Sequence, residues 1–96
     1  MHLEKNIINK IIEIGKKYNE INRIVLFGSR ARGDNSLRSD IDLAIYADSE
    51  ELQFAYDLEE NVDTLLEFDI TFVRDGLDKL LLEQIKKDGV YLYEKL

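Results

Sequence analysis

The sequence has no cysteine, no proline and no tryptophan, and it has a single histidine in 96 residues. Without cysteine the chain can form neither a disulfide bond nor a thiolate metal site, which fits a reducing compartment. Its uninterrupted apolar runs, such as residues 24–27, are far shorter than the roughly 20 residues of a membrane-spanning helix. Residues 1–5 contain no apolar signal core. These absences predict a cytoplasmic protein with no membrane association.

Positive charge is also scarce, because 20 acidic residues oppose 13 basic ones and the formal net charge is −7. Proteins that bind DNA or RNA gather positive charge, so this composition argues against direct nucleic-acid binding. An acidic chain can still hold a single nucleotide through a local arginine cluster and divalent cations. The acidity itself fits two interpretations about equally, solubility and recognition of a basic protein partner.

The length and the 45% hydrophobic content predict one small globular domain that spans residues 1–96. Apolar periodicity predicts a helix over residues 3–18, a short helical turn with Ser29 as its N-cap, and two later helices. The third helix follows a capping box of Asp48 and Glu51, and the fourth covers residues 77–87. Strands are expected at residues 23–27, 40–46 and 68–73, with a short final strand at 90–93.

The most informative stretch lies between the first two strands, at residues 28–42. It opens with Gly28 and Ser29, which can form a small-residue turn, and it closes with Asp40 and Asp42 at the start of a strand. Arginines at positions 30, 32 and 38 lie between them. A glycine turn, local positive charge and paired carboxylates together indicate a site for a polyphosphate and its metal ions.

The strand pattern predicts how these residues meet. Gly28 ends one strand and Asp40 begins the next, so they share a sheet edge only if the two strands are antiparallel. The long connection to the third strand contains a helix, as a parallel pairing requires, and it returns Asp69 to the same edge. Because side chains alternate along a strand, Asp40, Asp42 and Asp69 are expected on one open face.

Carboxylates that lie together repel each other unless cations bridge them. Oxygen ligands without histidine or cysteine suit magnesium, with manganese as the alternative, rather than zinc. Two such ions can stabilise the attacking and the leaving oxygens of a phosphoryl or nucleotidyl transfer. The pattern therefore predicts a site for two divalent cations and a nucleotide.

These residues also carry a resemblance. Residues 28–29, the spacer and residues 40–42 resemble the signature of the polymerase-beta-like nucleotidyltransferase superfamily. The fuller string is similar to the minimal nucleotidyltransferases, the MntA-like antitoxins of HEPN–MNT toxin–antitoxin pairs. Residues 68–70 resemble the segment with the third carboxylate of that family, and residues 85–93 resemble its usual C-terminal end.

The resemblance implies an α/β (α+β) fold, a polymerase-beta-like core with a small mixed sheet and helices packed mainly on one face. It implies that ATP is the substrate, with two Mg²⁺ ions, and that AMP passes to a tyrosine of a HEPN ribonuclease toxin in a hetero-oligomer. Asp40, Asp42 and Asp69 would bind metal, and Asp69 would also help to activate the acceptor hydroxyl. The nucleotide-binding residues are then expected to be Gly28, Ser29, Arg30, Arg38 and Ser39.

Two other functions stay open at this point. The chain could be a binding antitoxin that masks the toxin without chemistry, although the intact carboxylates at positions 40, 42 and 69 favour an enzyme. It could also transfer a nucleotide to a small molecule. The sequence disfavours this third function, because it has no helical acceptor domain like that of larger nucleotidyltransferases.

Overall fold

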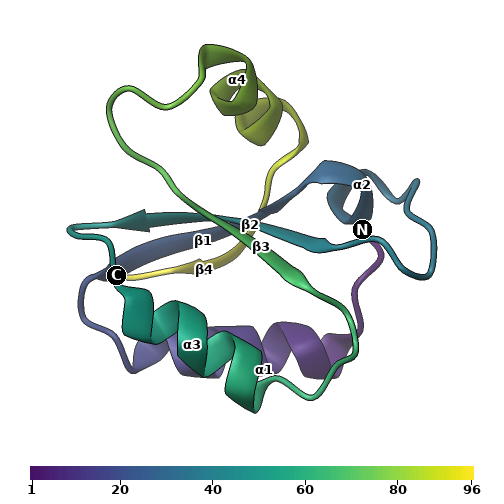
Figure 1. Ribbon diagram of the computed structural model, residues 1–96, viewed down its shortest axis with the longest axis horizontal. Coiled ribbons are helices and arrows are strands. Elements are labelled where there is room, and N and C mark those ends of the chain that lie inside the picture. Colours follow the sequence, from purple (N-terminus) through teal and green to yellow (C-terminus); the bar gives the residue numbers. More distant parts are fainter.

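The computed structural model describes residues 1–96, and strands and helices alternate regularly along the chain (Figure 1). The elements in order are α1 (Lys5–Lys16), β1 (Ile21–Phe27), α2 (Gly28–Arg32), β2 (Ile41–Ala47), α3 (Leu52–Asn61), β3 (Phe68–Phe72), α4 (Lys79–Asp88) and β4 (Val90–Glu94). The four strands form one sheet in the order β3-β2-β1-β4. None of the helices combines the length and the apolar character that a membrane span needs.

The strand directions match the sequence prediction. β1 and β2 pair antiparallel, with Phe27 opposite Asp42. β2 and β3 pair parallel, with Asp42 opposite Asp69. The last strand, β4, pairs antiparallel with β1 on the other side, which makes the sheet mixed. The predicted α/β fold class is therefore confirmed.

Helices cover both faces of the sheet, but unequally (Figure 1). The larger core lies between the sheet and α1 with α3, where Ile11, Leu43 and Phe54 are fully buried. On the opposite face a smaller cluster joins Ala44 of β2 to Ile85 of α4. The expected one-sided packing thus holds for α1 and α3, whereas α4 lies on the other face because its buried side chain meets the second set of alternating strand residues.

Two helix starts differ from the prediction. α2 begins at Gly28, so Ser29 lies inside the helix and is not its N-cap. The N-cap residue is Phe27. The positive φ of 75° at Gly28 allows the strand to turn directly into the helix. In α3 the N-cap is Glu51, whose side chain accepts a hydrogen bond from the amide of Gln53, in place of the expected capping box.

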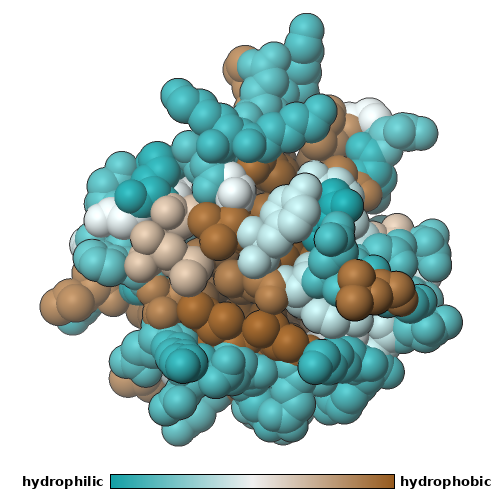
Figure 2. All heavy atoms as spheres, turned by 180° about the vertical axis from the view of Figure 1, so that it is seen from behind, coloured by the Kyte–Doolittle hydropathy of each residue, from teal (hydrophilic) through white to brown (hydrophobic).

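The outer strand β4 leaves an edge of the sheet uncovered. Its Val90, Leu92 and Tyr93 are only partly buried where they pack against the core. In the view from behind, apolar atoms form a band across the middle of the molecule, between polar atoms above and below (Figure 2).

Candidate active site

Carboxylates on two neighbouring strands meet where β1 ends and α2 begins. Asp42 on β2 lies opposite Asp69 on β3 in the parallel register. The alternate residues Ile41 and Leu43 are fully buried in the core, so the alternation turns Asp42 toward the other face. Asp69 is exposed, and Asp42 is half-buried. The predicted meeting of Asp42 with Asp69 is therefore present.

The surroundings of Asp42 disfavour its negative charge. Its pKa is raised from the ordinary 3.8 to about 6, first by burial, then by the negative charges of Asp69 and Asp40 and by a hydrogen bond with Asp69. The positive charge of Arg32 opposes this rise. A carboxylate whose charge is disfavoured by other carboxylates gains from any cation that binds there.

Asp40 is exposed and directly precedes β2. Its charge acts on Asp42 and helps to raise the pKa of that residue. No group of three or more histidine, cysteine, aspartate or glutamate side chains is arranged to hold a metal ion. The three carboxylates predicted to share one face thus form no ready-made metal site, although Asp42 is hydrogen-bonded to Asp69 and its pKa is raised by the charge of Asp40.

Two physical reasons favour glycine over any other residue at position 28. Its φ of 75° lies in the left-handed region that favours glycine. In addition, a Cβ atom at this position would collide with the carboxylate oxygen Oδ2 of Asp42. The backbone of Gly28 and the side chain of Asp42 are thus in direct contact, which joins the glycine turn to the carboxylates as predicted.

Ser29 follows within the first turn of α2, half-buried, and its hydroxyl makes no hydrogen bond in the protein. Its carbonyl oxygen accepts bonds from the amides of Gly33, at 2.8 Å, and Asp34, at 3.1 Å. The carbonyl therefore closes the short helix, while the hydroxyl stays available to a ligand.

Arg30 has a structural position instead of the predicted nucleotide contact. Its side chain is only 7% exposed. Its guanidinium donates to the carbonyl oxygens of Ser39 at 2.9 Å, His2 at 3.1 Å and Leu37 at 3.2 Å. These bonds tie the amino terminus and the loop before Asp40 to α2, so Arg30 supports the site without facing the carboxylates.

The other two predicted nucleotide-binding residues lie in the same loop. The Ser39 hydroxyl accepts a hydrogen bond from the amide of Ser36 at 2.9 Å, and the Ser39 carbonyl accepts one from the guanidinium of Arg30. Both groups therefore stabilise the loop. Arg38 is exposed and forms no ion pair or side-chain hydrogen bond. Both polar groups of Ser39 are therefore engaged within the protein, whereas the side chain of Arg38 is exposed to solvent.

Arg32 is the arginine that lies close enough to affect Asp42. It is held by Asp34 at 3.0 Å and by Asp88, at the end of α4, at 2.8 Å. The sequence analysis did not predict Asp88 for this region, because it lies 56 positions away from Arg32 and no local pattern marks it. The pair also connects α2 to α4 beside the site.

The family comparison agrees with this geometry. The family described as Polymerase beta, Nucleotidyltransferase matches residues 9–96. The chain belongs to the polymerase-beta nucleotidyltransferase family, and the prediction of an enzyme that transfers nucleotidyl groups is thereby confirmed. Comparison with curated proteins gives no match.

Solved structures with the same fold include minimal nucleotidyltransferase antitoxins. A mutant MntA toxin–antitoxin complex matches with a TM-score of 0.73 and 24% identity, over 92% of this chain and 73% of that chain. A toxin–antitoxin complex with AMP-PNP matches with a TM-score of 0.71 and 26% identity, over 97% and 75%. A complex of tri-AMPylated Shewanella oneidensis HEPN toxin with MNT antitoxin matches with a TM-score of 0.69 and 23% identity, over 97% and 74%. The resemblance seen in the sequence is thus confirmed at the level of the fold.

Proposed function

We propose that this protein is an antitoxin that transfers AMP from ATP to a tyrosine hydroxyl of a cognate HEPN ribonuclease toxin, and so neutralises it in the cytoplasm. The observation that carries the proposal is the direct contact of Gly28 with Asp42, which in turn pairs with Asp69. This contact supports the proposal, because a glycine turn that could hold a phosphate then lies beside carboxylates at one end of the sheet.

The residues then take distinct roles. The backbone at Gly28 and the free hydroxyl of Ser29 hold the triphosphate. The acceptor oxygen forms a bond to the α-phosphorus, the bond to the bridging oxygen breaks, and pyrophosphate leaves. Asp69, which is exposed beside Asp42, takes the proton of the acceptor hydroxyl.

Magnesium fits the donor set. The ligands offered are carboxylate oxygens alone, from Asp40, Asp42 and Asp69, and the raised pKa of Asp42 reflects negative charge that a cation would offset. Magnesium in proteins commonly takes only one or two carboxylates and completes its shell with phosphates and water, so a preformed cluster of three is not required. A bound magnesium ion would neutralise part of the negative charge of the phosphates.

A protein acceptor is supported by the relatives. One related structure contains a toxin with its antitoxin and AMP-PNP, and another contains a tri-AMPylated HEPN toxin with its MNT antitoxin. The net charge of −7 suits a basic partner. We infer the same class of acceptor for this chain.

The test is to incubate the protein with α-labelled ATP, magnesium and the HEPN protein encoded beside it. We expect label on the HEPN protein, lost when Asp40→Asn and Asp42→Asn are combined. Asp75→Asn, an exposed aspartate on another segment, is the matched control and should leave labelling unchanged.

Masking without chemistry is the competing function, and one observation favours it: three carboxylates are not gathered into a cation-binding cluster. The same assay separates the two. A tight complex without label, together with full protection by the double variant, would establish masking and refute the transfer.

A further inference from the structure

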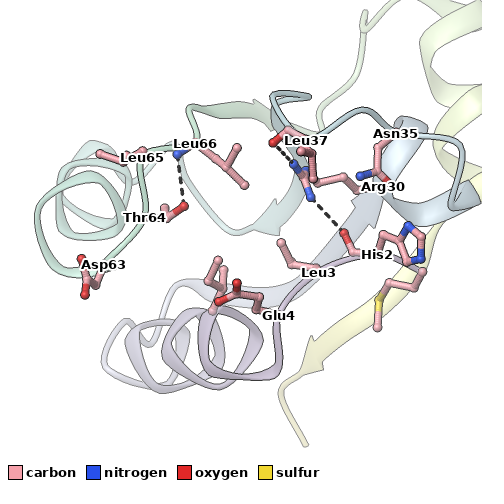
Figure 3. A pocket seen from close by; sticks show the side chains of 12 residues that line it. His2, Leu3, Glu4, Arg30, Asn35, Leu37, Asp63, Thr64, Leu65 and Leu66 are labelled. Atoms are coloured by element: carbon pink, nitrogen blue, oxygen red, sulfur yellow. Dashed lines mark hydrogen bonds between the residues drawn. The ribbon is translucent and has the colours of Figure 1, made fainter.

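The short helix α2 carries two arginines that contact different neighbours. The guanidinium of Arg30 points at the main-chain carbonyls of His2 and Leu37, in the wall of a hollow beside the amino terminus (Figure 3). Arg32 lies two positions further along the helix, so its side chain leaves from a different face. The charge of Arg32 acts on Asp42, which makes Arg32 the cation to consider at the carboxylates.

The geometry of α2 directs Arg32 toward Asp42. Residues four positions apart lie on one face of a helix, and their side chains tilt toward its N-terminus. Gly28 and Arg32 are related in this way, and a Cβ atom at Gly28 would collide with the carboxylate of Asp42. Arg32 therefore lies one turn away from the point at which α2 meets Asp42. An ion pair between Arg32 and Asp42 would offset the negative charges around this carboxylate.

That ion pair is not formed, and two other carboxylates hold the guanidinium of Arg32. Asp34 binds it at Nε, at 3.0 Å, and Asp88 binds it at Nη1, at 2.8 Å. The side chain of Asp34 is 62% exposed, whereas that of Asp88 is only 11% exposed. Because solvent screens the ion pair with Asp88 less, this carboxylate is the firmer of the two holds on Arg32.

Asp88 in turn depends on Arg32. It is the last residue of α4, where the helix dipole disfavours a negative charge and favours the basic residues Lys86 and Lys87 that precede it. Its side chain is largely buried, and Arg32 is its only ion-pair and hydrogen-bond partner. A buried carboxylate at this end of a helix needs such a cation, so Asp88 and Arg32 fix each other.

We propose that Asp88 is a positioning residue that holds Arg32 away from Asp42 and so keeps Asp42 available to a divalent cation. Without Asp88, the guanidinium would retain only the exposed partner Asp34 and would be free to pair with the half-buried Asp42. Its positive charge would then compete with the cation. The inference deepens the proposed function, because it assumes that the aspartates of the site bind a divalent cation.

The test measures the binding of Mn²⁺ to the protein alone, in titrations without nucleotide or acceptor. Asp88→Ala should raise the Kd for Mn²⁺ about three- to fivefold, which is the size of one partly exposed ion pair. Asp88→Asn keeps the shape of the side chain and should change the Kd in the same direction, which guards against a folding defect in the alanine variant. Asp75→Ala removes the same charge from an exposed position on another segment and should leave the Kd unchanged.

A double-mutant cycle separates this role of Asp88 from a merely structural one. In an Arg32→Gln background, Asp88→Ala should leave the Kd for Mn²⁺ unchanged, because there is no guanidinium to release. Arg32→Gln alone should bind Mn²⁺ at least as tightly as the wild type. The inference would be overturned by an unchanged Kd in Asp88→Ala, by an equal rise in both backgrounds, or by a wild type that binds no Mn²⁺.

The titration contains neither ATP nor the HEPN protein, so its outcome is separate from that of the labelling assay. A protein that labels the HEPN protein but binds Mn²⁺ equally well with and without Asp88 keeps the proposed function and loses the positioning role. A protein that shows the expected cycle but transfers no label keeps the positioning role and loses the transfer.

Discussion

Replacing Asp42 with asparagine should stabilise the protein while abolishing transfer. The pKa of Asp42 is raised to about 6, so folding favours its protonated form, and near neutral pH the native state holds a charge that its surroundings disfavour. Asparagine has the same shape and no charge. The side chain at position 42 keeps its close contact with the backbone of Gly28. The electrostatic repulsion from Asp69 and Asp40 is removed.

The size of this gain follows from the shift in pKa. One pKa unit corresponds to about 1.4 kcal/mol, so a rise from 3.8 to about 6 would be worth about 3 kcal/mol in a fully buried site. Asp42 is half-exposed, and solvent screening reduces this to about 1–2 kcal/mol. For a domain of this size that is an increase in Tm of roughly 5–10 °C.

The dependence on pH gives the sharper test. Because the pKa of Asp42 is raised in the folded state, the contribution of this residue to stability falls as the pH increases from about 4 to about 6 and is then constant. The Tm difference between Asp42→Asn and wild type, measured with a metal chelator, should therefore be present at pH 7 and vanish below pH 4. A variant that is less stable at pH 7, or a difference that does not change with pH, would refute the reasoning. Asp75→Asn should show no such difference.

Three further predictions concern groups around the site. Gly28→Ala should reduce AMP transfer by more than 100-fold, because the added Cβ atom would collide with the carboxylate of Asp42. Gly76 has a similar φ of 87° but no atom near its Cβ position, so Gly76→Ala should lower the stability by about 1 kcal/mol and leave the activity unchanged. Arg30→Ala should lower the free energy of unfolding by roughly 3 kcal/mol, since it removes a buried side chain and its hydrogen bonds to three main-chain carbonyls. Arg38→Ala, at an exposed position, should change it by less than about 0.5 kcal/mol in urea unfolding. Tyr18→Phe removes the 2.8 Å bond to a buried carboxylate and should cost about 1–2 kcal/mol in the same measurement, with labelling intact.

The sequence was sufficient to predict the order and directions of β1, β2 and β3 and the meeting of Asp42 with Asp69. Side chains alternate with a period of two along a strand, so the apolar residues Ile41 and Leu43 determine which way Asp42 points. The long connection with a helix between β2 and β3 allows the parallel pairing that the structure shows, and that pairing brings Asp69 beside Asp42. Both arguments use only local periodicity and chain connectivity, which a sequence displays directly.

The arginines could not be assigned in this way. Arg30 and Arg38 lie in the same motif with the same charge, yet one is buried against carbonyls and the other is exposed. What separates them is the path of the loop at residues 33–40 and the position of the amino terminus, where Arg30 donates to the carbonyl of His2. Such contacts depend on the whole fold, so residue type and spacing do not reveal them. The same holds for Asp88, which reaches Arg32 only because α4 ends beside α2.

The positions of the arginines predict that nucleotide binding by this protein depends on divalent cations. Arg30 directs its donors at carbonyls, and the charge of Arg32 is already opposed by Asp34 and Asp88. Arg38 is then the only arginine of the motif without a partner, while the carboxylates of the site repel a triphosphate. ATP should therefore bind at least 100-fold more weakly in a chelator than in magnesium, as titration calorimetry can measure. Equal affinity in both conditions would mean that the protein itself supplies the positive charge, and the proposed role of its aspartates would be wrong.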